Sequence, residues 1–294
     1  MAAVDAPRRR ARQGRSRPRL GRIGPAAITI LCALFFVLPL VAMARFSFQT
    51  LPMISLGKST LFKKWTFEGV TTAFRNPDFR SSLALSAKLA IGTVATTLAL
   101  LVPTTLWVHV RIPKARAFVE FLTVLPYVIP PIALVAGILP LKPHARWFLN
   151  SNYSLVPFYT VLALPFTFRA LDAGIKAIDV KTLVDASRSL GAGWGTTLRR
   201  AIIPNIRAAI ISASFLTAAV VLGEYTMARV LLKQTLPAFM AQYQSNEPQG
   251  GMALALAALV GTTALFAFLS VLTRPRRPRS SEDPVAPAPW KAQS

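Results

Sequence analysis

Apolar residues gather in six long runs that are separated by shorter polar segments. The runs lie near 25–44, 82–108, 117–139, 153–168, 208–232 and 251–272. A helix of about 20 residues crosses the hydrocarbon layer of a bilayer, and the fourth run is the one that is clearly short for this. The pattern therefore predicts an all-α, polytopic membrane protein with six transmembrane helices.

The composition and the charge distribution agree with this pattern. Of the 294 residues, 53% are hydrophobic and 15% are charged, as is typical of a chain that crosses a membrane several times. The net charge of +23 raises the question of nucleic-acid binding. However, most of the 34 lysines and arginines fall into the segments on one side of the predicted membrane. The positive-inside rule places that side and both termini in the cytoplasm, so we expect no nucleic-acid partner.

The two ends of the chain differ from its middle. Residues 1–24 hold eight arginines and one acid among Pro, Gly and Ser, which is too little apolar side chain to fold. They predict a disordered, cytoplasmic basic arm close to anionic membrane lipid. Ala42-Met43-Ala44 resembles a signal-peptide cleavage site, but the run before it is longer than a typical signal core, which favours a retained span. Residues 25–273 form the expected transmembrane domain, and residues 274–294 a disordered cytoplasmic tail.

Prolines interrupt three of the predicted spans, at Pro103, Pro126, Pro130, Pro131 and Pro165. Each proline frees a backbone carbonyl that neighbouring helices or water must satisfy. Kinked helices of this kind suit close packing or a solute pathway, and both interpretations stay open at this point.

The polar segment 169–207, between the fourth and fifth runs, predicts a short helix of its own. Asp179 can cap this helix by accepting hydrogen bonds from its first free amides. An apolar stripe follows, formed by Leu183, Val184, Ala186 and Leu190. The Gly-Ala-Gly run 191–193 then lets the chain turn. Pro204 is expected to start or kink the next segment, because it lacks an amide hydrogen. An apolar stripe on a projecting helix indicates that a partner covers it.

The spacing within this segment resembles a known signature. Asp185-Ala186-Ser187 is followed after three residues by Gly191, and after nine more by Ala201-Ile202-Ile203-Pro204. The spacing is similar to the loop of permease subunits in binding-protein-dependent type I ABC importers, which runs Glu-Ala-Ala, three residues, Gly, nine residues, Ile-x-Leu-Pro. The chain has Asp for Glu, Ser for Ala, Ala for Ile and Ile for Leu, and it keeps the spacing. The resemblance covers about residues 82–273.

The resemblance implies a fold, a function and a set of partners. The fold would be the six-helix transmembrane domain of a type I importer, with its core in 82–273 and its coupling loop in 169–207. The chain would be a membrane permease subunit that forms half of the pathway for a small solute. A dimer of ATP-binding subunits, a second permease expected to be a different chain, and an extracellular or periplasmic solute-binding protein would complete the importer. Its place would be the plasma (inner) membrane of a prokaryote.

The resemblance also assigns residues and a substrate branch. The residues implied in coupling to the ATPase are Asp179, Leu183, Asp185, Ala186, Ser187, Leu190, Gly191 and Pro204. Ala-Leu-Pro-Phe at 163–166 and Arg-Ala-Leu-Asp-Ala-Gly at 169–174 resemble the branch that imports polyamines, ferric iron, thiamine or phosphonates, and we expect a polyamine-like solute.

Glu224 is an acidic residue that falls within the apolar zone, where a charge is costly and usually has a purpose. It could pair with Arg229 or Lys88 in a structural role. Alternatively, Glu224 and its neighbour Tyr225 could line the route of a cationic solute.

The sequence contains no pattern for catalysis. A phosphate-binding loop with its Gly-Lys-Ser/Thr ending is missing, so ATP hydrolysis is expected in a separate subunit. His109 and His144 are isolated and lie on opposite sides of the predicted membrane, so we expect no metal site, and no cofactor. The alternative is a polytopic channel or membrane enzyme. An enzyme would require paired acids or histidines in the spans, and a channel would not require Gly191 and Pro204 at a fixed distance.

Overall fold

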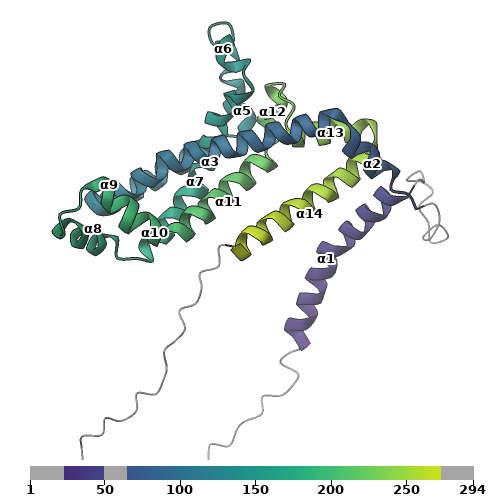
Figure 1. The fold of residues 1–294 in the computed structure, drawn as a ribbon. Coiled ribbons are helices and arrows are strands. Elements are labelled where there is room, and N and C mark those ends of the chain that lie inside the picture. The colour runs from purple at the N-terminus through teal and green to yellow at the C-terminus, as the bar shows by residue number, and fades with distance from the viewer. Residues whose placement is uncertain (1–22, 50–64, 273–294) are drawn as a thin grey trace, which may run out of the picture.

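The computed structural model describes residues 23–49 and 65–272 (Figure 1). The predictions for the basic arm up to residue 22 and for the tail 274–294 lie outside these residues. The described residues are helical or connecting, apart from one isolated bridge between Gln49 and Trp65. An all-α membrane fold is therefore confirmed for the described part of the chain.

The helices follow one another in a simple order. They are α1 (Ile23–Phe48), α2 (Glu68–Arg75), α3 (Pro77–Arg111), η4 (Pro113–Ala115), α4 (Arg116–Val128), α5 (Pro131–Ala136), η5 (Leu139–Leu141), α6 (Arg146–Leu149), η6 (Asn152–Ser154), α7 (Leu155–Lys176), α8 (Val180–Ser189), α9 (Trp194–Thr196), η7 (Thr197–Ile202), α10 (Ile203–Asn205), α11 (Arg207–Gly223), α12 (Thr226–Val230), α13 (Leu236–Asn246) and α14 (Pro248–Leu272).

Four helices in the described residues are long and apolar enough to cross a membrane unaided: α1, α3, α7 and α14. Two bent pairs raise the possible number of spans to six. In the first pair, the predicted span 117–139 breaks between α4 and α5 with a bend of 82°. The break falls at Ile129, which has an extended backbone and precedes Pro130. A proline disfavours helical geometry in the residue before it, and this explains the position of the break.

The second bent pair changes the expected fifth span. The helical run Trp194–Asn205 meets α11 at an angle of 75°, so the polar segment bends sharply into the span. The helix α11 ends at Gly223, whereas the sequence pattern extended the span to residue 232. The break comes at Glu224, which has an extended backbone. The apolar run continues past the break, and for this reason hydrophobicity alone did not reveal it.

The core of the molecule is the bundle of α3, α7 and α11, whose three helices contact one another along their lengths (Figure 1). The fourth predicted span, the shortest one, forms α7, and α7 is the most buried of the four long helices. Phe168 and Leu171 of α7 are fully buried. A hydrogen bond of 2.7 Å between the buried hydroxyls of Thr167 and Thr217 joins α7 to α11. Its buried position explains why α7 can carry more polar residues than a lipid-facing span.

A close approach between α7 and α11 fixes the bundle near its α8 end. Gly174 of α7 faces Ala209 of α11, and a Cβ on Gly174 would lie 2.1 Å from the Ala209 Cβ. No side chain fits there, so this position requires glycine. The two helices are therefore locked together where the segment containing α8 begins and ends.

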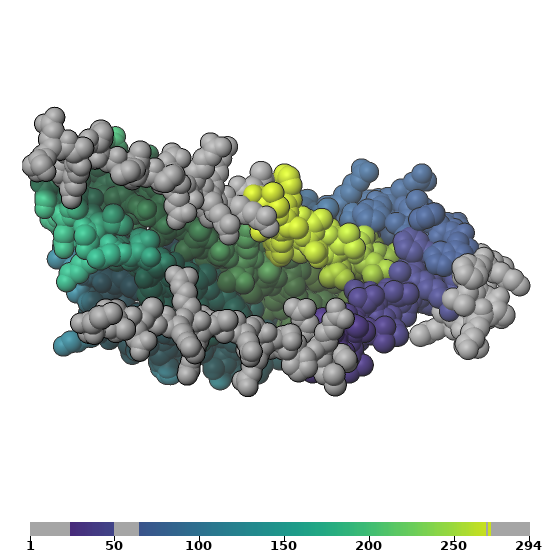
Figure 2. Space-filling view, turned by 90° about the horizontal axis from the view of Figure 1, so that it is seen from below, coloured from purple at the N-terminus to yellow at the C-terminus, as the bar shows by residue number. Residues whose placement is uncertain are grey.

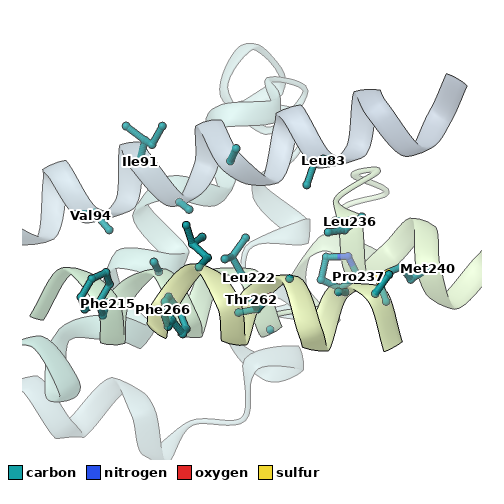
Figure 3. A pocket seen from close by; sticks show the side chains of 18 of the residues that line it. Leu83, Ile91, Val94, Phe215, Leu222, Leu236, Pro237, Met240, Thr262 and Phe266 are labelled. Carbon is teal, nitrogen blue, oxygen red and sulfur yellow. The ribbon is translucent and has the colours of Figure 1, made fainter. Parts of the chain in front are cut away.

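The helices α1 and α14 lean away from this bundle (Figure 1), and Figure 2 shows them from below, with α1 in purple and α14 in yellow. The apolar stretch of α1 buries nothing in the chain, and α14 buries 17% of its own. Between α14, α3 and α11 lies an open hollow of about 850 Å³, shown in Figure 3. Its lining includes Leu83, Phe215 and Phe266 and is apolar except for Ser214 and Thr262. A polar solute finds no partner there, so we do not assign the pathway to this hollow.

A lateral projection stands out from the side of the bundle (Figure 1). It consists of α5, η5, α6 and α12, and Figure 1 shows α6 at its tip. The helix α12 packs against α5. The lateral projection carries several exposed apolar side chains, among them Trp147 and Leu232, which are 82% and 84% exposed.

Candidate functional site

The candidate site is the segment between α7 and α11, which is shorter than expected. The coupling loop was predicted to begin at residue 169, but α7 continues as a helix to Lys176. The polar residues 169–176 therefore belong to the bundle. The site proper consists of α8, α9, η7 and α10, which lie together at one end of the molecule (Figure 1).

Asp179 starts α8 as predicted. Its carboxylate accepts a hydrogen bond of 3.2 Å from the amide of Thr182 and one of 2.6 Å from the Thr182 hydroxyl. The Thr182 hydroxyl is the main reason why the pKa of Asp179 is lowered, and the bond from the Thr182 amide adds to it. Asp179 is thus an ionised cap that satisfies a free amide at the positive end of the helix.

Gly191 ends α8 in a left-handed turn. The Gly191 amide donates to the Arg188 carbonyl over 2.9 Å, and the Ala192 amide donates to the Ser187 carbonyl over 3.1 Å. These two bonds form the Schellman pattern, in which the residue after the helix adopts a positive φ. Gly191 has a φ of +80°, which costs glycine little and costs other residues more. The chemistry of the turn therefore explains the glycine in the motif.

The apolar stripe of α8 divides into two faces, which corrects the expectation of a single exposed stripe. Val180 and Val184 are buried in a cluster whose other members lie on α3, α7, η7 and α11. Leu190 on the second face is 89% exposed, and Ala186 is exposed beside it. One face of α8 thus attaches it to the bundle, and the other stays open.

The remaining predicted residues of α8 flank the open face. Leu183 and Ser187 are half-buried, and Asp185 is exposed. The Ser187 hydroxyl donates to the Leu183 carbonyl over 2.8 Å, so it is occupied within its own helix. The structure brings the predicted residues from Asp179 to Gly191 together on one short helix, and Pro204 lies apart from them.

Pro204 does not occupy the place that the sequence suggested. It lies in the last turn of the second helical run, in α10, and the bend into α11 comes at Ile206. The turn before it, η7, is a widened π-helix. A wider turn accommodates a residue that lacks an amide hydrogen and crowds the preceding carbonyls. The expectation that Pro204 itself starts or kinks the next segment is therefore wrong by two residues.

A stack of arginine and tryptophan side chains, which the sequence did not reveal, joins this segment to α3. Arg111 lies over the rings of Trp107 and Trp194 at 5.7 and 5.5 Å, and Arg188 lies over Trp194 at 5.4 Å. Such contacts contribute about 0.5–1 kcal/mol each at exposed sites. Arg188, although exposed, thus has a ring partner within the chain. The signal available in the sequence was a tryptophan near each arginine, with Trp107 four residues before Arg111 and Trp194 six residues after Arg188.

A cluster of charges forms at the ends of α3 and α7 and the start of α4. Asp172 accepts two hydrogen bonds from Arg116, of 2.6 and 2.9 Å, and lies 3.0 Å from the Lys176 ammonium. The His109 Nε2 lies 3.2 Å from the same carboxylate, so His109 has an acidic neighbour that the sequence did not reveal. These residues are far apart in sequence, and only the packing of the helices brings them together.

Glu224, the candidate pathway residue, is buried and engaged in a structural contact. Its carboxylate accepts hydrogen bonds from the amides of Met227, over 2.9 Å, and Ala228, over 3.4 Å, at the start of α12. Neither of the cations considered, Arg229 and Lys88, forms an ion pair with it among the described residues. Tyr225 is 40% exposed and points no polar group at Glu224 within bonding distance.

Comparisons with known proteins agree with this architecture. Residues 106–278 match the family described as binding-protein-dependent transport system inner membrane component. A relative in Sinorhizobium fredii (strain NBRC 101917 / NGR234), described as probable ABC transporter permease protein y4fN, is 27% identical over 223 residues. The match covers 72% of this chain and 38% of that protein. A bacterial ABC transporter involved in the import of the acidic polysaccharide alginate, known from a crystal structure, has a TM-score of 0.67 at 16% identity, covering 88% of this chain and 99% of that one.

The matched family residues make up more than half of the chain, so the chain belongs to this family. It is a membrane-embedded permease subunit of the ABC importer type, and thus a transport subunit rather than an enzyme. The likeness to the alginate importer shows a shared fold. The comparisons leave open the polyamine, iron, thiamine or phosphonate branch that the sequence resembled.

Proposed function

We propose that this chain forms half of the pathway of an ATP-driven importer for a small solute, and that α8 is the helix on which a separate ATPase subunit acts. The single observation that supports this role is the divided surface of α8. One face is buried against four other elements, and the opposite face presents Leu190 and Ala186 without cover. A helix that is firmly attached on one side and exposes apolar side chains on the other is suited to receive a force from a partner.

The attachments of α8 give a physical route for that force. Val184 packs in the same cluster as Ile206 and Ala209, at the start of α11. Arg188 and Trp194 connect α8 with the end of α3 through Arg111. A displacement of α8 would therefore move α3 and α11 together. ATPase closure and opening would then favour two alternative packings of the spanning bundle.

The proposed importer contains further subunits. A dimer of ATP-binding subunits would occupy the α8 end, and a second, different permease would complete the pathway. An extracellular or periplasmic binding protein would deliver the solute. We place both termini and α8 in the cytoplasm of a prokaryote, with the chain in its plasma (inner) membrane, because most lysines and arginines lie in the segments on that side.

A polyamine-like solute was expected from the resemblance, and the site offers no support for it. A polycation requires carboxylates that face the pathway. Glu224 is the acidic residue that the sequence offered, and two backbone amides occupy its oxygens. The described residues therefore favour a structural role for Glu224, and the proposal extends to a small solute without the polyamine assignment.

The coupling role can be tested with one substitution and one matched control. Leu190→Asp places a charge on the open face of α8, and the fold should tolerate it because Leu190 is 89% exposed. Leu232→Asp makes the same change at an 84% exposed leucine on the lateral projection. We expect Leu190→Asp to lose the co-purifying ATPase and ATP-dependent uptake in membrane vesicles, and Leu232→Asp to retain the ATPase. An unchanged ATPase yield and uptake in Leu190→Asp would exclude α8 as the contact.

The proposed orientation has its own test. Ser189 on α8 is exposed, and Cys32 is the chain's one cysteine. In a Cys32→Ala, Ser189→Cys variant, a membrane-impermeant maleimide should label the protein only after the cells are opened. Labelling of intact cells would place α8 outside and contradict the proposed arrangement.

A further inference from the structure

A second hollow, of about 250 Å³, lies within the lateral projection. It is bounded by Leu139 and Lys142 on one side, by the turn at Asn150, and by the end of α12 with Leu232 and Lys233. The hollow has more polar character than the large apolar one beside α14, and two of its lining residues are lysines. Such a combination of small size and positive charge suits a small anionic group.

Lys233 is a buried cation. The residue is only 8% exposed, and its ammonium group donates a hydrogen bond of 2.7 Å to the backbone carbonyl of Asn150. No carboxylate forms an ion pair with it among the described residues. Burying a charge is expensive unless an opposite charge compensates it. A carbonyl dipole provides only part of that compensation.

Lys142 adds a second positive charge at the rim of the same hollow. The pKa of Lys233 is lowered, first because the group is buried and second because Lys142 repels its charge. The surrounding sequence offers no counter-charge, since residues 121–171 and 225–246 contain neither Asp nor Glu. The hollow is therefore a positive site without an acidic partner from these segments.

The backbone at the hollow is also strained. Leu232 has a φ of +56° and is the one non-glycine residue with a positive φ among the described residues. The amide of Lys233 donates to the Ala228 carbonyl over 2.8 Å, and the amide of Leu232 donates to the Arg229 carbonyl over 3.2 Å. This left-handed turn directs the chain so that Lys233 points inward. Strain of this kind persists where the surroundings enforce it, often at functional sites.

We propose that the hollow on the lateral projection is an anion site that binds a carboxylate or phosphate group between Lys142 and Lys233. The two ammonium groups would supply the charge, and the bound oxygen atoms would restore the compensation that Lys233 lacks in the chain itself. The group could belong to a dissolved solute or to a lipid head group, since both carry the same chemistry. The site shares no residue with α8, so it does not depend on the proposed coupling role.

The test measures protection of the two lysines from chemical modification. The full-length chain, with the subunits that co-purify with it, is placed in nanodiscs of zwitterionic phosphatidylcholine and treated with a low dose of acetic anhydride. Acetylation of each lysine is followed by mass spectrometry in inorganic phosphate, in succinate, and in chloride of equal ionic strength. Nanodiscs that contain phosphatidylglycerol, in chloride alone, test the lipid source.

We expect phosphate or succinate to slow the acetylation of Lys142 several-fold and to leave Lys114 unaffected. Lys233→Met, which keeps an unbranched side chain one atom shorter and removes the buried charge, should abolish the protection. Arg146→Gln, an equal loss of charge outside the hollow, should retain it. Protection by phosphatidylglycerol without free anion would identify a head group as the source.

Three results would overturn the proposal. They are a lack of protection in every anion and lipid, equal slowing at all exposed lysines, and unchanged protection of Lys142 in Lys233→Met. Should Lys233→Met fail to fold, the comparison of Lys142 with Lys114 in the unaltered protein still decides between specific binding and a general effect of salt.

Discussion

The helices α8 and α12 end in the same hydrogen-bond pattern, but one uses a glycine and the other a leucine. After α8, the left-handed residue is Gly191, with a φ of +80°. After α12 it is Leu232, with a φ of +56°. In each case the amide of the left-handed residue and the amide of the residue after it donate to carbonyls in the last turns of the helix, over 2.8 to 3.2 Å. The shared pattern makes the two stops directly comparable.

The difference between them lies in what surrounds the turn. A Cβ on Gly191 would meet nothing within 4 Å, so no neighbour enforces this turn and its own residue must favour it. The turn after α12 follows Met227 and Ala228, which are fully buried, and it leads into the buried Lys233. Tertiary contacts can therefore hold a leucine at a positive φ, which is otherwise typical of glycine. The turn at Gly191 has no such support.

The largest effect on the comparison is expected from forcing α7 and α11 apart, because α8 lies between these two helices in the chain. Gly174→Ala would bring a methyl group to 2.1 Å from the Ala209 Cβ, forcing α7 and α11 apart. We expect a loss of about 3 kcal/mol of stability, the upper range for overpacking. Thermal unfolding of the purified complex measures it. Gly193→Ala is the control, because nothing lies within 4 Å of that position. Equal melting temperatures for the two variants would contradict the locked contact.

A smaller effect is expected from removing the stack that ties α8 to α3. Trp194→Ala removes the ring on which Arg111 and Arg188 lie and should cost about 1–2 kcal/mol for two contacts. Hydrogen exchange in α8 should accelerate while exchange in α12 stays unchanged. Combining Trp194→Ala with Arg111→Gln should cost less than the sum of the single changes, because the residues share one interaction. Strict additivity would argue against the stack.

The left-handed residues that follow α8 and α12 can each be replaced. Gly191→Ala should destabilise the protein and Leu232→Gly should stabilise it, each by about 1 kcal/mol, because a side chain is unfavourable at positive φ. Chemical unfolding of both variants against the unaltered protein measures the pair. A stabilising Gly191→Ala, or a destabilising Leu232→Gly, would show that contacts other than the backbone conformation decide these stops.

The smallest expected effect is a dependence of phosphate protection on pH, which arises from Lys233 just after α12. Since burial and Lys142 lower the pKa of Lys233, its charge is lost at a lower pH than that of an ordinary lysine. Phosphate protection of Lys142 should therefore weaken as the pH rises through the lowered pKa. The protein itself should gain stability over the same range, because the unfolded state then binds more protons than the folded one. Protection that persists until ordinary lysines lose their charge would contradict this.

Several elements could be predicted because their signals are local. The cap at Asp179, the turn at Gly191 and the helical nature of the apolar runs depend on residues close in sequence, and the structure confirms them. The break at Glu224 and the displaced bend near Pro204 could not be predicted in the same way. At Glu224 the apolar pattern continues through the break, and near Pro204 the bend comes two residues after the proline, so the local pattern fixed neither position.

Contacts between residues that are far apart in the chain could not be predicted from the sequence pattern. Asp172 and Arg116 are 56 positions apart, and Lys233 and Asn150 are 83 positions apart. In the sequence, His109 showed no acidic neighbour, whereas in the structure it lies beside Asp172. The partners of such residues depend on which helix ends lie side by side, and no local pattern encodes this.

By itself, the sequence determined that this chain is helical, crosses a membrane and carries a capped helix between its fourth and fifth spans, because length, hydrophobicity and helix caps act within a few turns. The tertiary structure decided which face of α8 is open, how α8 is attached to α3 and α11, and that two lysines meet in one hollow. These features depend on close packing between elements that are remote in the chain, and they exist only once the bundle has formed.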